Sequence, residues 1–112
     1  MISGNPKESD WKRFRKITPD LREKYLAKKN AKLLKLLTAT KSTPTEQFWD
    51  TFEVMLKEKR ILESCLDGHS RSRMFDKMLL MRRCGMLPDE DLEPFSDKLK
   101  SDLTEMAKIL RN

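Results

Sequence analysis

Apolar residues recur along the chain at spacings of three and four, which is the period of an α-helix. The clearest stripe lies near the C-terminus and comprises Phe95, Leu99, Leu103, Met106 and Leu110. Runs that alternate between β-branched and polar residues, as half-buried strands do, are missing from the sequence. The pattern therefore predicts an all-α fold.

The N-terminal third predicts two helices that are separated at Pro19. Ser9-Asp10 is typical of an N-cap followed by an acidic first turn, which predicts a short helix over Trp11–Ile17. Thr18 is placed to cap a second helix, with Pro19 at its first position, where the missing N–H has no helical acceptor. We therefore expect a break in the chain direction at this point.

The second helix is expected to continue to about Leu37 or Ala39. At 100° per residue its apolar residues fill one broad arc, comprising Tyr25, Leu26, Leu33, Leu34, Leu36 and Leu37. Four basic residues fall outside that arc, within about 80° of each other. They form what we call the lysine stripe, comprising Lys24, Lys28, Lys32 and Lys35.

The strongest local signal opens the next helix. Thr43 as N-cap, Pro44 at the first position and Glu46 at the third predict a capping box, with reciprocal side-chain-to-backbone bonds. The helix should run to about Leu66. Apolar residues occupy more than one of its sides, comprising Phe48, Trp49, Phe52, Met55, Leu56, Leu62 and Leu66 on one side and Val54, Ile61 and Cys65 on another. We therefore predict that it is the central helix of the fold.

Glycine and proline mark the remaining boundaries. Gly68 and Gly85 are each predicted to end a helix, because glycine adopts the left-handed conformation without strain. Between them, Ser70 or Ser72 is expected to cap a helix rich in methionine and leucine. Pro94 predicts a break near residue 93 and a fresh helix from that proline, after a short acidic turn at 88–91.

Together these elements predict a compact bundle of four main helices with a short extra N-terminal helix. The length of 112 residues fits a single helical domain spanning 1–112, in which residues 1–8 form a flexible tail. No apolar segment approaches the roughly 20 residues needed to cross a bilayer. Because the N-terminus also lacks the apolar core of a signal peptide, we expect a cytoplasmic protein.

Charge is distributed unevenly around the net value of +6. Residues 7–41 hold twelve Lys or Arg against four Asp or Glu, a balance of +8, so the rest of the chain carries −2. Such asymmetry suggests a nucleic acid or an acidic protein surface as partner. The alternative is that the basic residues only solvate a surface helix.

The sequence offers little support for a catalytic or metal-binding site. Cys65 and His69 are four apart, but Gly68 interrupts the helix that would place them on one face. Cys65 and Cys84 with one histidine fall short of a zinc site, and no glycine-rich phosphate loop occurs. We therefore expect no enzyme, no metal and no cofactor, and two reduced thiols packed as small apolar groups.

Two basic features are the candidate binding sites for nucleic acid or another anion. The first is the lysine stripe, about 16 Å long, which is backed by Arg13, Arg15 and Lys16. The second is Arg71 and Arg73 at the start of a helix, where free N–H groups and the helix dipole favour an anion.

Two functional hypotheses follow. One is a small basic helical protein that binds nucleic-acid phosphates without strong sequence preference. The other is a helical protein–protein interaction or regulatory module, including the case of a homodimer, in which the lysines have no nucleic-acid role.

Overall fold

In the computed structural model, which describes residues 5–111, every regular element is helical. A 3₁₀ turn, η1 (Arg71–Arg73), precedes α3. The α-helices are α1 (Glu8–Leu37), α2 (Pro44–Leu66), α3 (Met74–Cys84), α4 (Asp89–Leu92) and α5 (Asp97–Arg111). The all-α prediction is confirmed, whereas the helices divide the chain differently from the predicted four plus one. Of the predicted tail 1–8, residues 1–4 lie outside the described residues and Glu8 is already helical.

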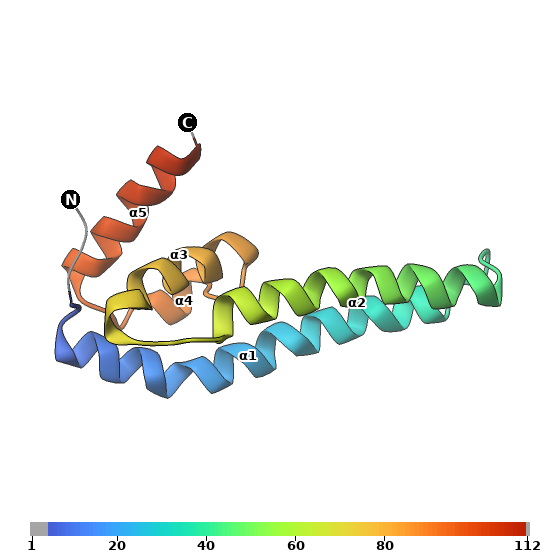
Figure 1. Cartoon of the computed structure of the whole chain (residues 1–112), viewed down its shortest axis with the longest axis horizontal. Coiled ribbons are helices and arrows are strands. Elements are labelled where there is room, and N and C mark those ends of the chain that lie inside the picture. The colour runs from blue at the N-terminus through green and yellow to red at the C-terminus, as the bar shows by residue number, and fades with distance from the viewer. Residues whose placement is uncertain (1–4, 112) are drawn as a thin grey trace.

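The two long helices, α1 and α2, form an antiparallel hairpin that extends well beyond the other elements (Figure 1). The molecule measures 51 × 32 × 24 Å and its radius of gyration is 16.7 Å, against about 13 Å for a compact domain of this length. The prediction of a compact bundle is therefore wrong. We call residues 30–57 the arm, and residues 5–29 with 58–111 the body.

Helix α1 passes through Pro19 without a break, so the predicted separate helix over Trp11–Ile17 is wrong. Proline removes one backbone hydrogen bond, the one to the Arg15 carbonyl. Next to it, the Thr18 hydroxyl donates to the Phe14 carbonyl at 2.6 Å. Buried side chains lie on both sides of the proline, including Phe14 and Leu21. Their common packing on the body holds the two segments in one line.

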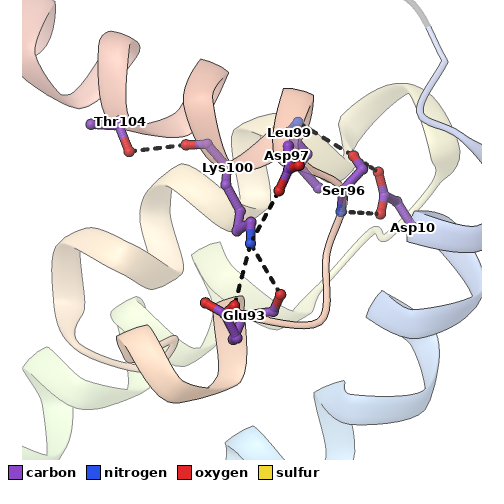
Figure 2. Close-up of polar contacts among 7 residues, drawn as sticks. All are labelled: Asp10, Glu93, Ser96, Asp97, Leu99, Lys100 and Thr104. Atoms are coloured by element: carbon purple, nitrogen blue, oxygen red, sulfur yellow. Dashed lines mark hydrogen bonds and ion pairs between the residues drawn. The ribbon is translucent and has the colours of Figure 1, made fainter.

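The start of α1 also differs from the prediction. The helix begins at Glu8, its N-cap position is Lys7, and no side chain caps it, so the assignment of Ser9 as N-cap is wrong. The Asp10 side chain instead accepts hydrogen bonds from Ser96, just before α5. Its carboxylate is buried and accepts from the Ser96 N–H at 2.9 Å and the Ser96 hydroxyl at 2.6 Å (Figure 2).

Ser96 in turn caps α5, because its hydroxyl accepts from the Leu99 N–H at 3.3 Å (Figure 2). The predicted break near Glu93 is confirmed, although α5 begins at Asp97 rather than at Pro94. Lys100 bridges the break by donating to the Glu93 carbonyl at 3.2 Å. The first turns of α5 are thus fixed to α1 and α4, while its C-terminal half projects away from the body (Figure 1).

Helix α2 begins with the predicted capping box. The Glu46 N–H donates to the Thr43 hydroxyl at 3.1 Å, and the Thr43 N–H donates to the Glu46 carboxylate at 2.8 Å. However, only Thr51 and Cys65 of this helix are buried, and Phe48 is 59% exposed. The prediction that α2 is packed on more than one side is therefore wrong for the arm, where α1 is its neighbour, although α2 contacts both α1 and α3 (Figure 1).

Both predicted glycine stops are confirmed by positive φ angles, 70° at Gly68 and 84° at Gly85. At the second stop, the N–H groups of Met86 and Leu87 both donate to the Met81 carbonyl. The predicted side-chain cap at Ser70 or Ser72 is absent from this part of the structure. The 3₁₀ turn η1 leads into α3 there, and the Ser70 and Ser72 hydroxyls lie 3.3 Å apart.

The hydrophobic core lies entirely in the body, where α3 packs against the hairpin and α5. Its fully buried members are Phe14, Leu21, Cys65, Met74, Met78, Met81, Met86 and Leu87. The C-terminal stripe contributes Phe95, Leu99 and Leu103, but Leu110 is 65% exposed. None of the helices within residues 5–111 combines the length and the apolar character needed to cross a membrane.

Candidate functional site

The lysine stripe lies on one uninterrupted helix, α1. All four side chains are exposed, and Lys24 Nζ lies 3.4 Å from the Asp91 carboxylate of α4. The backing residues Arg13, Arg15 and Lys16 are exposed too, in the first half of the same helix. Arg15 is directed over the Trp11 ring at 5.8 Å, a cation–π distance. The four stripe lysines are therefore exposed along one helix, whereas Arg15 turns toward Trp11 instead of extending the stripe.

The second basic candidate, Arg71 with Arg73, is arranged differently. Arg71 forms two hydrogen bonds to the Glu8 carboxylate, at 2.9 and 3.2 Å, and lies 5.5 Å over the Trp11 ring. This pairing holds the pKa of Glu8 below its usual value. The Arg73 guanidinium instead lies close to Gly68. The two arginines therefore point to different partners, and Arg71 pairs with the exposed Glu8 carboxylate of the same chain.

His69, the only histidine, closes the end of α2. Its Nε2–H donates to the Cys65 carbonyl at 2.7 Å, since a carbonyl oxygen can only accept. Its ring packs against Phe14, with centroids 4.8 Å apart. The contact is to the backbone of Cys65 and not to its thiol, so these two residues are arranged as a helix end. Across residues 5–111, His, Cys, Asp and Glu side chains do not gather in threes at a metal-binding distance.

A feature that sequence reasoning missed is an apolar surface on the arm. Phe48, Trp49 and Phe52 make edge-to-face contacts with one another, with centroids 5.0 and 6.0 Å apart, yet each remains about half exposed. We call the whole set the apolar arm face, comprising Leu34, Leu37, Phe48, Trp49, Phe52, Met55 and Leu56. Its signal in the sequence is the apolar character of several sides of α2, a pattern that a buried helix shares.

The size of this face is unusual for a protein surface. Exposed fractions range from 38% at Leu56 to 62% at Leu34. With about 200 Å² for each fully exposed side chain, the seven residues present roughly 700 Å² of accessible surface. Contiguous apolar patches beyond a few hundred Å² mark interaction sites more often than bare surface.

Helical periodicity places the apolar arm face and the lysine stripe on different sides of the hairpin. At 100° per residue, Leu34 and Leu37 lie to one side of the α1 residues that face α2, and the lysines lie to the other side. Since α2 runs antiparallel, Phe48 and Phe52 fall on the same side as these leucines, and Trp49 adjoins them on the side of α2 that points away from α1. One side of the arm is thus apolar and the other is basic.

Very few side chains are buried between the two helices of the arm. Between residues 30 and 57 only Thr51 is buried, and its hydroxyl donates to the Gln47 carbonyl at 2.6 Å. The Gln47 side chain crosses the hairpin and donates to the Ala39 carbonyl at 2.9 Å. Leu33, Leu36 and Val54 are only half-buried. Two helices alone therefore leave most of the arm's apolar surface in contact with water.

The arm joins the body at a polar cluster. The Tyr25 hydroxyl donates to the Glu58 carboxylate, whose other oxygen lies 3.5 Å from Lys29 Nζ. Lys29 also lies 5.1 Å from the centre of the Tyr25 ring. Burial, together with this carboxylate, raises the pKa of Tyr25. The Tyr25 hydroxyl is thus a donor that joins α1 to α2.

A second missed feature is the meeting of the two cysteines. Cys65 Sγ, near the end of α2, lies 3.7 Å from Cys84 Sγ, the last residue of α3. Both are free thiols; Cys65 is buried and Cys84 is partly exposed. Each cysteine stands shortly before a helix-ending glycine, but nothing in the sequence fixes the angle at which the two helices meet.

Comparisons of the chain with protein-family models, curated proteins and solved structures gave no significant match.

Proposed function

We propose that the protein is a helical interaction module that functions as a homodimer, joined through the apolar arm face. One observation carries this proposal: seven exposed apolar side chains lie on an arm that extends beyond all the other elements (Figure 1). A helix pair with an apolar side needs another layer to cover it.

A second copy of the chain is the occupant that fits best. A two-fold interface joins the same patch on both copies, so it needs no other partner. The roughly 700 Å² available on each copy is close to the ~800 Å² per partner of a standard interface. Two antiparallel hairpins would together form four helices around one apolar core, the usual solution for such pairs.

The charge distribution supports the same arrangement. A chain of net charge +6 resists self-association wherever its basic residues would meet. The lysine stripe lies on the other side of α1 from Leu34 and Leu37. Pairing through the apolar arm face therefore directs both lysine stripes outward, away from each other.

The experiment is sedimentation velocity of the full chain over a wide concentration range, compared between two variants with an added or a removed charge. Trp49→Glu places a carboxylate in the apolar arm face, and Lys57→Gln removes one positive charge from an exposed position outside it, so both variants have a net charge lower by one. We expect the parent and Lys57→Gln to be dimers and Trp49→Glu to be a folded monomer. Far-ultraviolet circular dichroism checks that each variant keeps its helices.

A parent chain that stays monomeric at the highest concentration would overturn the proposal, as would a dimer that tolerates Trp49→Glu. Flotation of the parent with anionic lipid vesicles separates one alternative. Monomers that bind vesicles through Trp49 would assign the face to a membrane surface instead. Monomers that bind neither a second copy nor vesicles would rule out the proposed role of the apolar arm face.

A second candidate function, binding of nucleic-acid phosphates or an acidic protein surface, rests on the lysine stripe. Lys28, Lys32 and Lys35 are exposed along one continuous helix, and exposed lysines at such spacing can follow a phosphate backbone. In a dimer the two stripes would present two such surfaces.

The test replaces all four stripe lysines by glutamine. The matched control makes the same change at four other exposed lysines, Lys41, Lys57, Lys59 and Lys108. If the stripe neutralises phosphates, only the stripe variant binds generic duplex DNA more weakly than the parent. The slope of log affinity against log salt should fall by about 0.9 for each lysine–phosphate ion pair that the substitution removes. Equal weakening in both variants would indicate nonspecific attraction to net charge alone.

A further inference from the structure

We propose that Cys65 and Cys84 form a redox-active dithiol that is oxidised to an intramolecular disulfide by small, negatively charged disulfides. The sulfurs, from α2 and α3, lie 3.7 Å apart. A disulfide bond of about 2.05 Å requires them to approach by roughly 1.7 Å more. Both cysteines stand in the last turns of their helices, beside a glycine-containing stop, where the backbone adjusts most readily.

One of the two cysteines is accessible to a reagent in solution. A hollow of about 380 Å³ on the surface is lined by both cysteines together with Arg60, Ile61, Ser64, Leu80 and Arg83. Cys84 is partly exposed there, whereas Cys65 is only 2% exposed. Cys84 is therefore the sulfur that a reagent reaches first, and Cys65 is the one that lies behind it.

The electrostatic surroundings of the two sulfurs also favour Cys84 as the thiol that reacts first. The contact between the two thiols lowers the pKa of Cys84 and raises that of Cys65. Burial raises the pKa of Cys65 further. The charged or titratable groups near the pair are Tyr25, Glu58, Arg60, Lys77 and Arg83. The attacking species in thiol–disulfide exchange is the thiolate, so Cys84 attacks and Cys65 resolves.

The exchange proceeds in two balanced steps. The Cys84 thiolate attacks one sulfur of the small disulfide, forms a mixed disulfide and releases the other half as a thiolate. The Cys65 thiol then loses its proton to solvent, attacks Cys84 Sγ and releases the second half. The two protein thiols are oxidised to one disulfide, and the small disulfide is reduced to two thiols.

The arginines indicate the class of reagent. Arg60 and Arg83 are exposed residues at the edge of the same hollow as the sulfurs, and their positive charges attract carboxylates. A disulfide that carries carboxylates, such as oxidised glutathione, is therefore favoured over a neutral one such as hydroxyethyl disulfide. The product would tie the ends of α2 and α3 together within the body.

The experiment follows the intact mass of the full chain during incubation with oxidised glutathione. We expect the parent to lose two hydrogens and to become unreactive toward iodoacetamide. Cys65→Ser should accumulate the glutathione adduct on Cys84, because no second thiol resolves it. Cys84→Ser should react at least about tenfold more slowly, since the remaining thiol is buried.

Two comparisons keep the outcome decisive. Arg60→Gln with Arg83→Gln should slow the reaction with oxidised glutathione but leave that with hydroxyethyl disulfide unchanged. In concentrated urea the difference between the two serine variants should disappear, because both thiols are then equally exposed. A parent that forms no intramolecular disulfide, or equal reactivity of the two serine variants in the folded state, would overturn the proposal.

Discussion

Helices α1 and α2 run through both the body and the arm, but their apolar residues are buried in the body and exposed in the arm. In the body, Phe14 and Leu21 of α1 are at most 1% exposed, beneath α3 and the segments around it. In the arm, Leu34 of the same helix and Phe48 of α2 are about 60% exposed. Apolar periodicity thus indicates which residues can pack against another surface. Only the tertiary structure shows whether another part of the same chain covers them.

The sharpest way to break this comparison is to truncate one phenylalanine in each region. Phe14→Ala should lower the free energy of unfolding by about 3–5 kcal/mol, because it leaves a cavity among fully buried side chains. Phe48→Ala should change it by less than about 1 kcal/mol in dilute solution, where the side chain is largely hydrated. Urea denaturation at low protein concentration measures both values.

Raising the protein concentration sharpens the same comparison. If the chain dimerises through the apolar arm face, Phe48→Ala should become more destabilising as concentration rises, since dimer formation stabilises the folded state by mass action. Phe14→Ala should show the same destabilisation at every concentration. Equal destabilisation by the two variants in dilute solution would mean that Phe48 is buried within the monomer.

A smaller effect is expected at the contact that joins the two ends of the chain. Asp10→Ala leaves the Ser96 N–H and hydroxyl without their buried acceptor and weakens the start of α5. We expect a loss of about 1–3 kcal/mol in the free energy of unfolding. Ser9→Ala, one residue earlier on an exposed position, should stay within about 0.5 kcal/mol. A larger loss at Ser9 would restore it as the cap of α1.

These contrasts also show what the sequence could and could not reveal. The capping box at Thr43 and the helix stops at Gly68 and Gly85 were predictable, because each depends on a few neighbouring residues. The continuity of α1 through Pro19 was not, since a local rule was overridden by packing on both sides of the proline. Local signals predicted the start of α2 and the ends of α2 and α3, but not the starts of α1, α3 and α5.

The candidate sites divide in the same way. The exposure of the lysine stripe on a single helix face followed from spacing alone. The contact between Cys65 and Cys84 did not, because it depends on how α2 and α3 meet. The use of Arg71 by Glu8, 63 positions away, could not be predicted either. Contacts between distant segments are set by tertiary packing, which periodicity does not encode.

The smallest expected effect lies at the tip of the arm, and it tests whether the arm unfolds together with the body. Thr43→Ala removes the hydroxyl that accepts from the Glu46 N–H, a loss of about 1 kcal/mol for a typical N-cap. If unfolding is cooperative, the urea midpoint of the whole chain should fall accordingly. If the arm opens on its own, the midpoint should hold while amide exchange in residues 46–57 accelerates about fivefold.

Acid provides an independent check on the same cap, through Glu46. The Thr43 N–H donates to its carboxylate and holds the pKa of Glu46 below the ordinary value of 4.5. A group whose pKa is lowered by folding contributes stability above its unfolded pKa and loses that contribution as the pH falls through the folded value. The protection factors of the arm amides, which are corrected for the pH dependence of intrinsic exchange, should therefore fall below about pH 4.5 in the parent, and Glu46→Gln should remove that fall. Protection that is insensitive to both Thr43→Ala and acid would show that the thin arm is held by its covered apolar face instead of its cap.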